Sequence, residues 1–144
     1  MTIVNHECYV SLEVAKLLKE AGFDWECKEY YYNFATTGWS LSFDDNFVNW
    51  NSWSERYISA PTLDVAQRWL REVKQLDISI HYDSTIKSQP YAYSIYDVEE
   101  KFDDIFGIIS PVTHSYSDGY FYKYEEVQEV GIKKALEIIL EKGE

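Results

Sequence analysis

The chain has 144 residues, of which 46% are hydrophobic and 17% aromatic, and its formal net charge is −12. This length suits one domain with a sizeable core, so we expect a single domain over residues 1–144. The composition excludes a coiled-coil or collagen rod, a disulfide scaffold and wholesale disorder. An acidic surface repels phosphate backbones, which disfavours ordinary nucleic-acid binding through a basic patch.

Nothing in the sequence predicts a membrane or secreted location. No stretch approaches the roughly 18 consecutive apolar residues of a membrane span. The first ten residues contain His6 and Glu7 and lack the basic and apolar regions of a signal peptide. The two cysteines, Cys8 and Cys27, are too few for a disulfide framework and favour reduced thiols. We therefore expect a cytoplasmic protein.

The first predicted helix runs from Ser11 to about Ala21. Ser11 is a good N-cap, and Gly22 stands where a glycine commonly ends a helix. Apolar residues recur on one face at helical spacing: Val14, Leu17, Leu18 and Ala21.

The second predicted helix follows Ala60-Pro61-Thr62 and ends near Gln75. Pro61 disfavours a helical conformation at Ala60, and Thr62 can cap the helix. Its apolar stripe consists of Leu63, Ala66, Leu70 and Val73, widened by Trp69.

The third predicted helix runs from about Tyr124 to Glu141. Its apolar positions match the helical template: Ile132, Ala135, Leu136, Ile139 and Leu140, with Val127, Val130 and Ile138 beside them. An apolar arc this wide predicts burial against a sheet.

Strands are predicted between the helices. Residues 39–43 alternate cleanly, which is typical of a half-buried strand, and the Tyr-rich residues 26–34 precede them across a hairpin loop. Residues 78–82 and 91–96 also alternate, and two short strands flank a turn at residues 117–119.

The resulting order is α-β-β-α-β-β-(β-β)-α. Short loops between paired strands imply mainly antiparallel pairing. We therefore predict an α+β fold, a mainly antiparallel sheet with about three helices packed on one face. The other face would carry Tyr, Ser and His and lie largely in solvent.

Three stretches together resemble a known family. They read VSLEVAKLLKEAGF over residues 10–23, SAPTL followed by QRWLRE over 59–72, and YEE followed by GIKKAL over 124–136. In combination they resemble an uncharacterised family of small acidic proteins from Bacteroidales genomes and their prophages or mobile elements. The chain departs from the family at Lys123, where a capping residue is usual, and the stretch from Asp97 to Pro111 looks like an elaboration. The resemblance implies a cytoplasmic, phage-derived protein and carries over no catalytic residues.

The sequence offers no catalytic, metal or cofactor motif. The pair His81 and Asp83 can share one strand face, but a metal site needs three or four such ligands. No G-x-S-x-G, P-loop or G-x-G-x-x-G pattern is present, and adjacent acids such as Asp44-Asp45 are usually only solvated. We therefore predict no metal, no cofactor and no catalytic residue.

The candidate binding residues lie in two places. The segment 47–57 interleaves Trp50 and Trp53 with polar residues and ends in Arg56 and Tyr57, and Trp and Arg in a polar loop are enriched at binding hot spots. The alternative is that both Trp side chains cover one end of the core. On the second helix Arg68 and Arg71, with Lys74, form a cluster of bases that can hold an anion, unless neighbouring acids neutralise it.

These observations favour a non-enzymatic protein-interaction module whose partner is another protein or a second copy. Two alternatives stay open. One is an acidic DNA mimic or anti-defence protein, because the chain carries a net charge of −12, part of which comes from the five acids and one Lys between Asp97 and Asp104. The other is a small-molecule binder or enzyme that uses the Tyr-rich sheet face.

Overall fold

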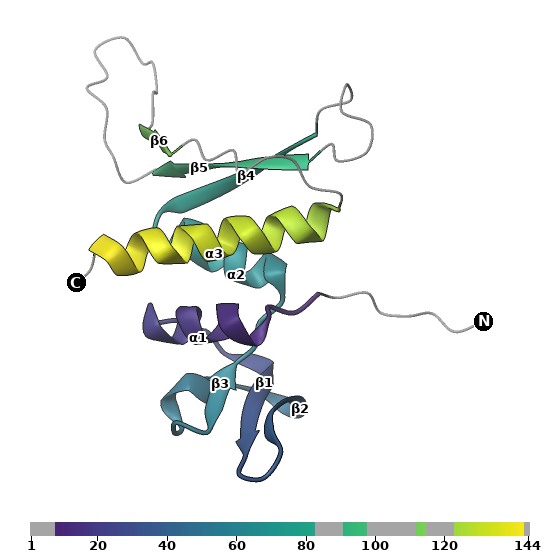
Figure 1. Ribbon diagram of the computed structural model, residues 1–144. Coiled ribbons are helices and arrows are strands. Elements are labelled where there is room, and N and C mark those ends of the chain that lie inside the picture. Colours follow the sequence, from purple (N-terminus) through teal and green to yellow (C-terminus); the bar gives the residue numbers. More distant parts are fainter. Residues whose placement is uncertain (1–7, 83–90, 98–111, 115–122, 143–144) are drawn as a thin grey trace. The chain divides into compact units, whose positions relative to one another are not determined.

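The computed structural model describes residues 8–82, 91–97, 112–114 and 123–142 (Figure 1). Their elements follow the order α1-β1-β2-η1-β3-α2-β4-β5-β6-α3, which confirms the α+β class with antiparallel pairing. The chain divides into two compact units, Met1–Ala66 and Gln67–Glu144, and the boundary falls within α2 (Leu63–Glu72). That the chain forms one domain stays a prediction.

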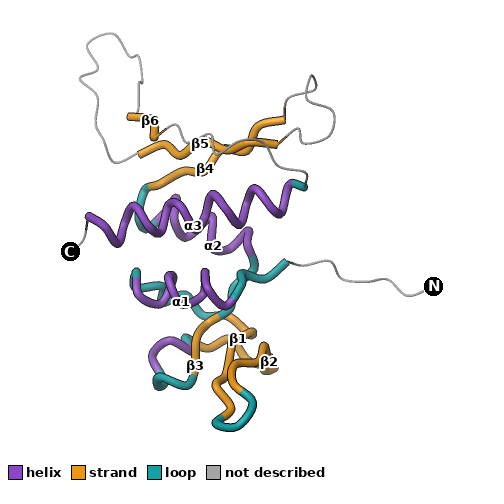
Figure 2. Tube along the Cα trace, viewed as in Figure 1, coloured by secondary structure: helices purple, strands orange, loops and turns teal. Residues whose placement is uncertain are grey.

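The first unit contains a three-stranded antiparallel sheet. Its strands are β1 (Cys27–Phe34), β2 (Gly38–Val48) and β3 (Tyr57–Ser59), in the order β2-β1-β3. The hairpin between β1 and β2 ends at Gly38, whose φ of 84° is a left-handed conformation that glycine adopts without strain. In both ribbon and tube views α1 (Leu12–Glu20) lies on one side of this sheet (Figures 1 and 2).

Helix α1 begins and ends as predicted. The Ser11 Oγ accepts a hydrogen bond of 3.2 Å from the Val14 N–H, which satisfies one of the free donors of the first turn. At the other end Gly22 has a φ of 98°. The predicted face of the helix is buried through Val14, Leu18 and Ala21.

Alternate residues of β1 face opposite sides of the first sheet. Tyr31 lies opposite Leu41 of β2 and the buried Ile58 of β3, and its hydroxyl donates to the Val10 carbonyl at 2.8 Å. This face is therefore the one toward α1. The other face carries Tyr30, Tyr32 and Phe34.

The second unit contains a second antiparallel sheet and α3 (Tyr124–Lys142). Strands β4 (Leu76–Tyr82), β5 (Tyr91–Asp97) and β6 (Val112–His114) pair in that order. Helix α3 packs against β4 and β5 through the predicted apolar arc, in which Val127, Ile132, Ala135 and Leu136 are fully buried (Figure 1). Gly131 lies at a close approach of α3 to the sheet, where an added Cβ would lie 3.0 Å from Ile78 Cγ2.

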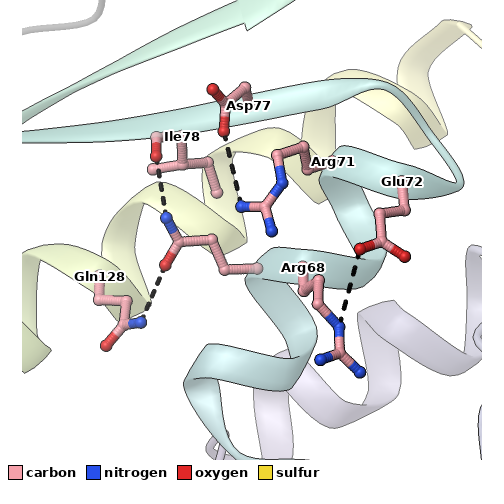
Figure 3. Close-up of polar contacts among 7 residues, drawn as sticks. Arg68, Arg71, Glu72, Asp77, Ile78 and Gln128 are labelled. Atoms are coloured by element: carbon pink, nitrogen blue, oxygen red, sulfur yellow. Dashed lines mark hydrogen bonds and ion pairs between the residues drawn. The ribbon is translucent and has the colours of Figure 1, made fainter.

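Two glutamines join three elements of the second unit. The Gln67 side chain on α2 donates from Nε2 to the Ile78 carbonyl on β4 at 2.9 Å. The buried Gln128 on α3 donates in turn from its Nε2 to Gln67 Oε1 at 2.9 Å (Figure 3). Because Gln128 is only 2% exposed, this bond satisfies a polar group that water cannot reach.

The structure differs from the sequence analysis in several elements. The strands form two sheets, and β3 was not predicted, because its three residues lie at the end of a segment without a clear period. Val73 is 48% exposed and lies beyond α2, so its placement in the buried stripe was wrong. The predicted half-burial of residues 39–43 was also wrong at Leu41 and Phe43, which are exposed. Both residues lie on the edge strand β2, part of which is not covered by other elements of the described chain.

Candidate functional site

The segment between β2 and β3 is held in place by a buried tryptophan. Trp50 begins the short 3-10 helix η1 (Trp50–Ser52) and is 3% exposed. Its indole Nε1 donates a hydrogen bond of 2.8 Å to the carbonyl oxygen of Cys27. Trp50 therefore belongs to the core of the first unit, as the alternative interpretation of this segment expected.

Two further side chains fix the same segment. The Asn51 amide donates to the Phe23 carbonyl and accepts from the Ser59 N–H, both at 2.9 Å. From α1, the Lys19 ammonium donates to the carbonyls of Ser54 and Tyr57, at 3.0 and 2.9 Å. The segment is thus tied to β1, β3 and α1 by hydrogen bonds on both sides of Trp53.

Six aromatic rings form a continuous cluster on the sheet face away from Tyr31, which we call the aromatic surface. It consists of Tyr30, Tyr32 and Phe34 from β1, Trp50 and Trp53 from the segment before β3, and Tyr57 from β3. Tyr57 is central: its ring centroid lies 4.9 Å from that of Tyr32, 5.2 Å from that of Trp53 and 5.6 Å from that of Trp50. Such edge-on and stacked pairs stabilise one another beyond their buried area.

The aromatic surface has a buried side and an exposed side. Trp50 forms the buried side, whereas Trp53 is 57% exposed and Phe34 is 42% exposed. An indole that is held by its neighbours and still open to solvent loses little conformational entropy when it contacts a partner. This arrangement is typical of a binding hot spot.

Charged groups border the aromatic surface. Burial raises the pKa of the Tyr30 hydroxyl, and the nearby Tyr57, Asp44 and Tyr32 raise it further. Tyr30 therefore remains a neutral hydrogen-bonding group at physiological pH. The exposed Arg56 donates from Nη1 to the Asn33 carbonyl at 3.4 Å, so it lies beside the last residues of β1.

The arginines predicted on the second helix lie in the second unit. Arg68 Nε is 3.9 Å from a Glu72 carboxylate oxygen, and Arg71 Nη1 is 3.9 Å from Asp77 Oδ1 (Figure 3). All four side chains are between 38 and 54% exposed, so each ion pair contributes little to stability. The acids beside both arginines weaken the case for an anion site there.

Of the predicted binding residues, the structure brings Trp50, Trp53 and Tyr57 into one cluster with Arg56 at its border. The sequence analysis missed the three residues contributed by β1. Tyr30, Tyr32 and Phe34 stand at alternate positions of one strand, so period-two spacing was the signal that could have placed them on one face.

The candidates for metal chemistry gain no support. His81 Nε2 lies 3.0 Å from Ser94 Oγ, and Asp83 falls outside the described residues, as does most of the acidic stretch from Asp97 to Asp104. The described residues hold no group of three or more His, Cys, Asp or Glu side chains arranged to bind a metal ion. In the same part of the chain, no helix has both the length and the apolar character needed to cross a bilayer.

Comparison with known proteins does not assign the chain to a family. No protein-family profile, curated protein or solved structure matches it. The functional argument therefore rests on the site itself.

Proposed function

We propose that the chain is a non-enzymatic protein-interaction module that contacts another protein through the aromatic surface. One observation carries this proposal: Trp53 is 57% exposed although hydrogen bonds fix the chain on both sides of it. Exposure of the apolar ring of Trp53 to water is unfavourable. Burial of its apolar area against a partner would be worth about 25 cal/mol per Å².

The composition of the surface fits a protein partner. Trp, Tyr and Arg are the residues most enriched at protein interfaces, and Trp53, Tyr57 and Arg56 lie within five residues of one another. The Tyr32 and Tyr57 side chains add hydroxyl groups to an otherwise apolar cluster, and interfaces commonly combine apolar area with hydrogen-bonding groups. A cytoplasmic location in a bacterial cell and a prophage or mobile-element source are further parts of the proposal, and they rest on the sequence resemblance alone.

The two alternatives stay predictions. The DNA-mimic hypothesis depends on the net charge of −12 being presented as rows of carboxylates, and most of the acidic stretch from Asp97 to Asp104 lies outside the described residues. Among the described acids, Glu72 and Asp77 pair with arginines and so do not present bare carboxylates. A ligand that stacks on Tyr32 or Tyr57 would need the same surface as a protein partner.

Quantitative affinity capture from a lysate of the native host tests the proposal. The wild-type chain is compared with Trp53→Ala and with Tyr82→Ala, a control that removes an aromatic ring 65% exposed in the second unit. We expect a defined protein to be recovered with the wild type and the control, and roughly thirtyfold less with Trp53→Ala, as for a hot spot worth about 2 kcal/mol. Equal recovery by all three proteins, or no specific protein at all, would contradict the proposal.

A further inference from the structure

Strand β2 exposes apolar side chains along the edge of the first sheet. In the described part of the chain β2 pairs with β1 on one side only. Leu41 is 45% exposed and Phe43 is 75% exposed, on the same face as the half-buried Trp39. A long apolar edge strand readily pairs with another strand, and many proteins protect such an edge with Lys or Pro, neither of which occurs in β2.

The hydrogen bonds of β1 show which main-chain groups of β2 face outward. Asn33 N–H donates to the Arg56 carbonyl, and the Glu29 carbonyl accepts from Ala60 N–H, so the odd-numbered residues of β1 bond toward β3. The even-numbered residues therefore bond toward β2, where Tyr32 and Tyr30 lie opposite Ser40 and Ser42.

It follows that Ser40 and Ser42 use their main-chain groups within the sheet. The N–H and C=O groups of Trp39, Leu41 and Phe43 then point away from β1, along the open edge. The three residues with outward main-chain groups are also the three apolar residues of this stretch.

We propose that a second copy of this chain covers this edge, by antiparallel pairing of the two β2 strands about a two-fold axis at Leu41. In this register Leu41 faces Leu41 of the second copy, and Trp39 faces Phe43 in both directions. All three pairs join outward-pointing main-chain groups, so each can form the two hydrogen bonds of a bonded antiparallel pair. Leucine and aromatic side chains meet across the strands, which is a favourable pairing.

The charges support this occupant and this register. Asp45 follows Phe43 at the next odd-numbered position, so in the second copy it comes to the end of the strand that holds Trp39, whereas Asp44 lies near Tyr30 on the other face. Lys16 lies there, with its Nζ 5.5 Å from the centroid of the Trp39 ring. A register shifted toward the C-terminal ends of the two strands would place the aspartates of the two copies opposite each other. Repulsion between these like charges disfavours that register.

The irregular end of β2 and the symmetry of the contact limit the pairing to a closed dimer. Between Glu29↔Phe43 and Cys27↔Val48 the register of β1 and β2 is irregular, so β2 departs from regular pairing directly after Phe43. A two-fold contact also uses the β2 edge of both copies, so neither copy has this edge left for a third. The proposal goes beyond the aromatic surface, because Trp39, Leu41 and Phe43 lie on the opposite face of the sheet.

Sedimentation equilibrium over a wide range of protein concentrations tests the dimer. We expect the wild type to shift from monomer to dimer, with no larger species. Leu41→Lys places two ammonium groups against each other on the axis and should keep the protein monomeric. The control Phe47→Ser removes an apolar ring 62% exposed on the same strand but outside the paired stretch, and it should dimerise like the wild type. A wild type that stays monomeric, or a Leu41→Lys protein that still dimerises, would overturn the proposal.

Cysteine cross-linking tests the register without depending on a disruptive substitution. In a Cys8→Ser background, which removes the exposed native thiol, Leu41→Cys places two thiols opposite each other. A bonded antiparallel pair has a Cα separation of about 5.5 Å, which suits a disulfide. Under mild oxidation with diamide Leu41→Cys should form a covalent dimer quickly, whereas Ser40→Cys, which faces Ser42 of the second copy, should not. Equal rates for the two variants would overturn the register. Circular dichroism checks that both remain folded, and loss of dimerisation does not affect the capture experiment on Trp53.

Discussion

The indole Nε1 of Trp50 lies 2.8 Å from the carbonyl oxygen of Cys27. This hydrogen bond distinguishes Trp50 from Trp53, which lies three residues later in the sequence. Trp50 is fixed in the core, and Trp53, with its ring centroid 5.1 Å from that of Trp50, is left in solvent. One short segment thus provides a buried tryptophan that stabilises the fold, Trp50, and an exposed tryptophan that is a candidate for partner contact, Trp53.

Substitution of the two tryptophans should change the stability of the protein by different amounts. Trp50→Phe keeps a ring but leaves the Cys27 carbonyl without its donor, so we expect a loss of about 1–3 kcal/mol in the free energy of unfolding. Trp53→Ala removes an exposed ring and should change it by less than about 1 kcal/mol. Urea denaturation of both variants measures this, and a similar loss for the two would contradict the assignment of separate roles.

The two cysteines should differ in reactivity. Cys8 is exposed, whereas burial raises the pKa of the Cys27 thiol. Because the pKa of Cys27 is raised in the folded state, this thiol contributes fully to stability below its unfolded pKa of about 8.5. That contribution is lost as pH rises through its pKa in the folded protein. A thiol reagent such as Ellman's reagent should therefore label Cys8 rapidly at neutral pH and should label Cys27 only when the protein unfolds. Rapid labelling of both sites in the native protein would contradict the burial of Cys27.

The close approach at Gly131 gives a third prediction. Gly131→Val would place new atoms against Ile78 and Tyr93, so we expect a loss of about 1–3 kcal/mol from overpacking. Gly131→Ala in an Ile78→Ala background should instead gain stability relative to Ile78→Ala alone, because alanine favours the helix and the space is free. A double-mutant cycle of Gly131→Ala and Ile78→Ala, measured by thermal unfolding, checks this. Additive effects of the two substitutions would contradict direct contact between these positions.

The buried glutamine pair gives a pH-dependent prediction. Gln128→Glu would place a carboxylate where an amide donates to Gln67 Oε1, so the ionised form has no proton to donate and is desolvated. The pKa of the new carboxyl should rise above its ordinary value of about 4.3, and the variant should lose stability as pH increases through that range. Unfolding measured between acidic and neutral pH, with Gln128→Met as the uncharged control, should show this loss for Gln128→Glu only. A pH-independent difference between the two variants would count against it.

The sequence predicted the three helices well because their signals are local. Ser11 and Thr62 cap their helices as expected: each hydroxyl accepts a hydrogen bond of 3.2 Å from an N–H three residues on. The hairpins at β1–β2 and β4–β5 were predicted for the same reason, since alternation and turn residues are neighbours in the chain.

The candidate site was only partly predictable because it depends on pairing between distant residues. Trp50 and Trp53 were singled out, but nothing in their spacing separates the buried ring from the exposed one. Tyr30 and Tyr57 meet because β3 pairs with β1, and a three-residue strand is too short to recognise from its own pattern. The exposure of Phe43 follows from the position of β2 at the sheet edge, which alternation alone does not reveal.

Site-specific photo-cross-linking in living host cells tests the central claim most directly. Benzoylphenylalanine is introduced at position 53 or, as a control, at position 82, and the cells are irradiated before lysis. The proposed interaction surface predicts one defined cross-linked protein from position 53 that is absent from position 82. An absence of cross-links at position 53, or the same set of cross-links from both positions, would contradict it.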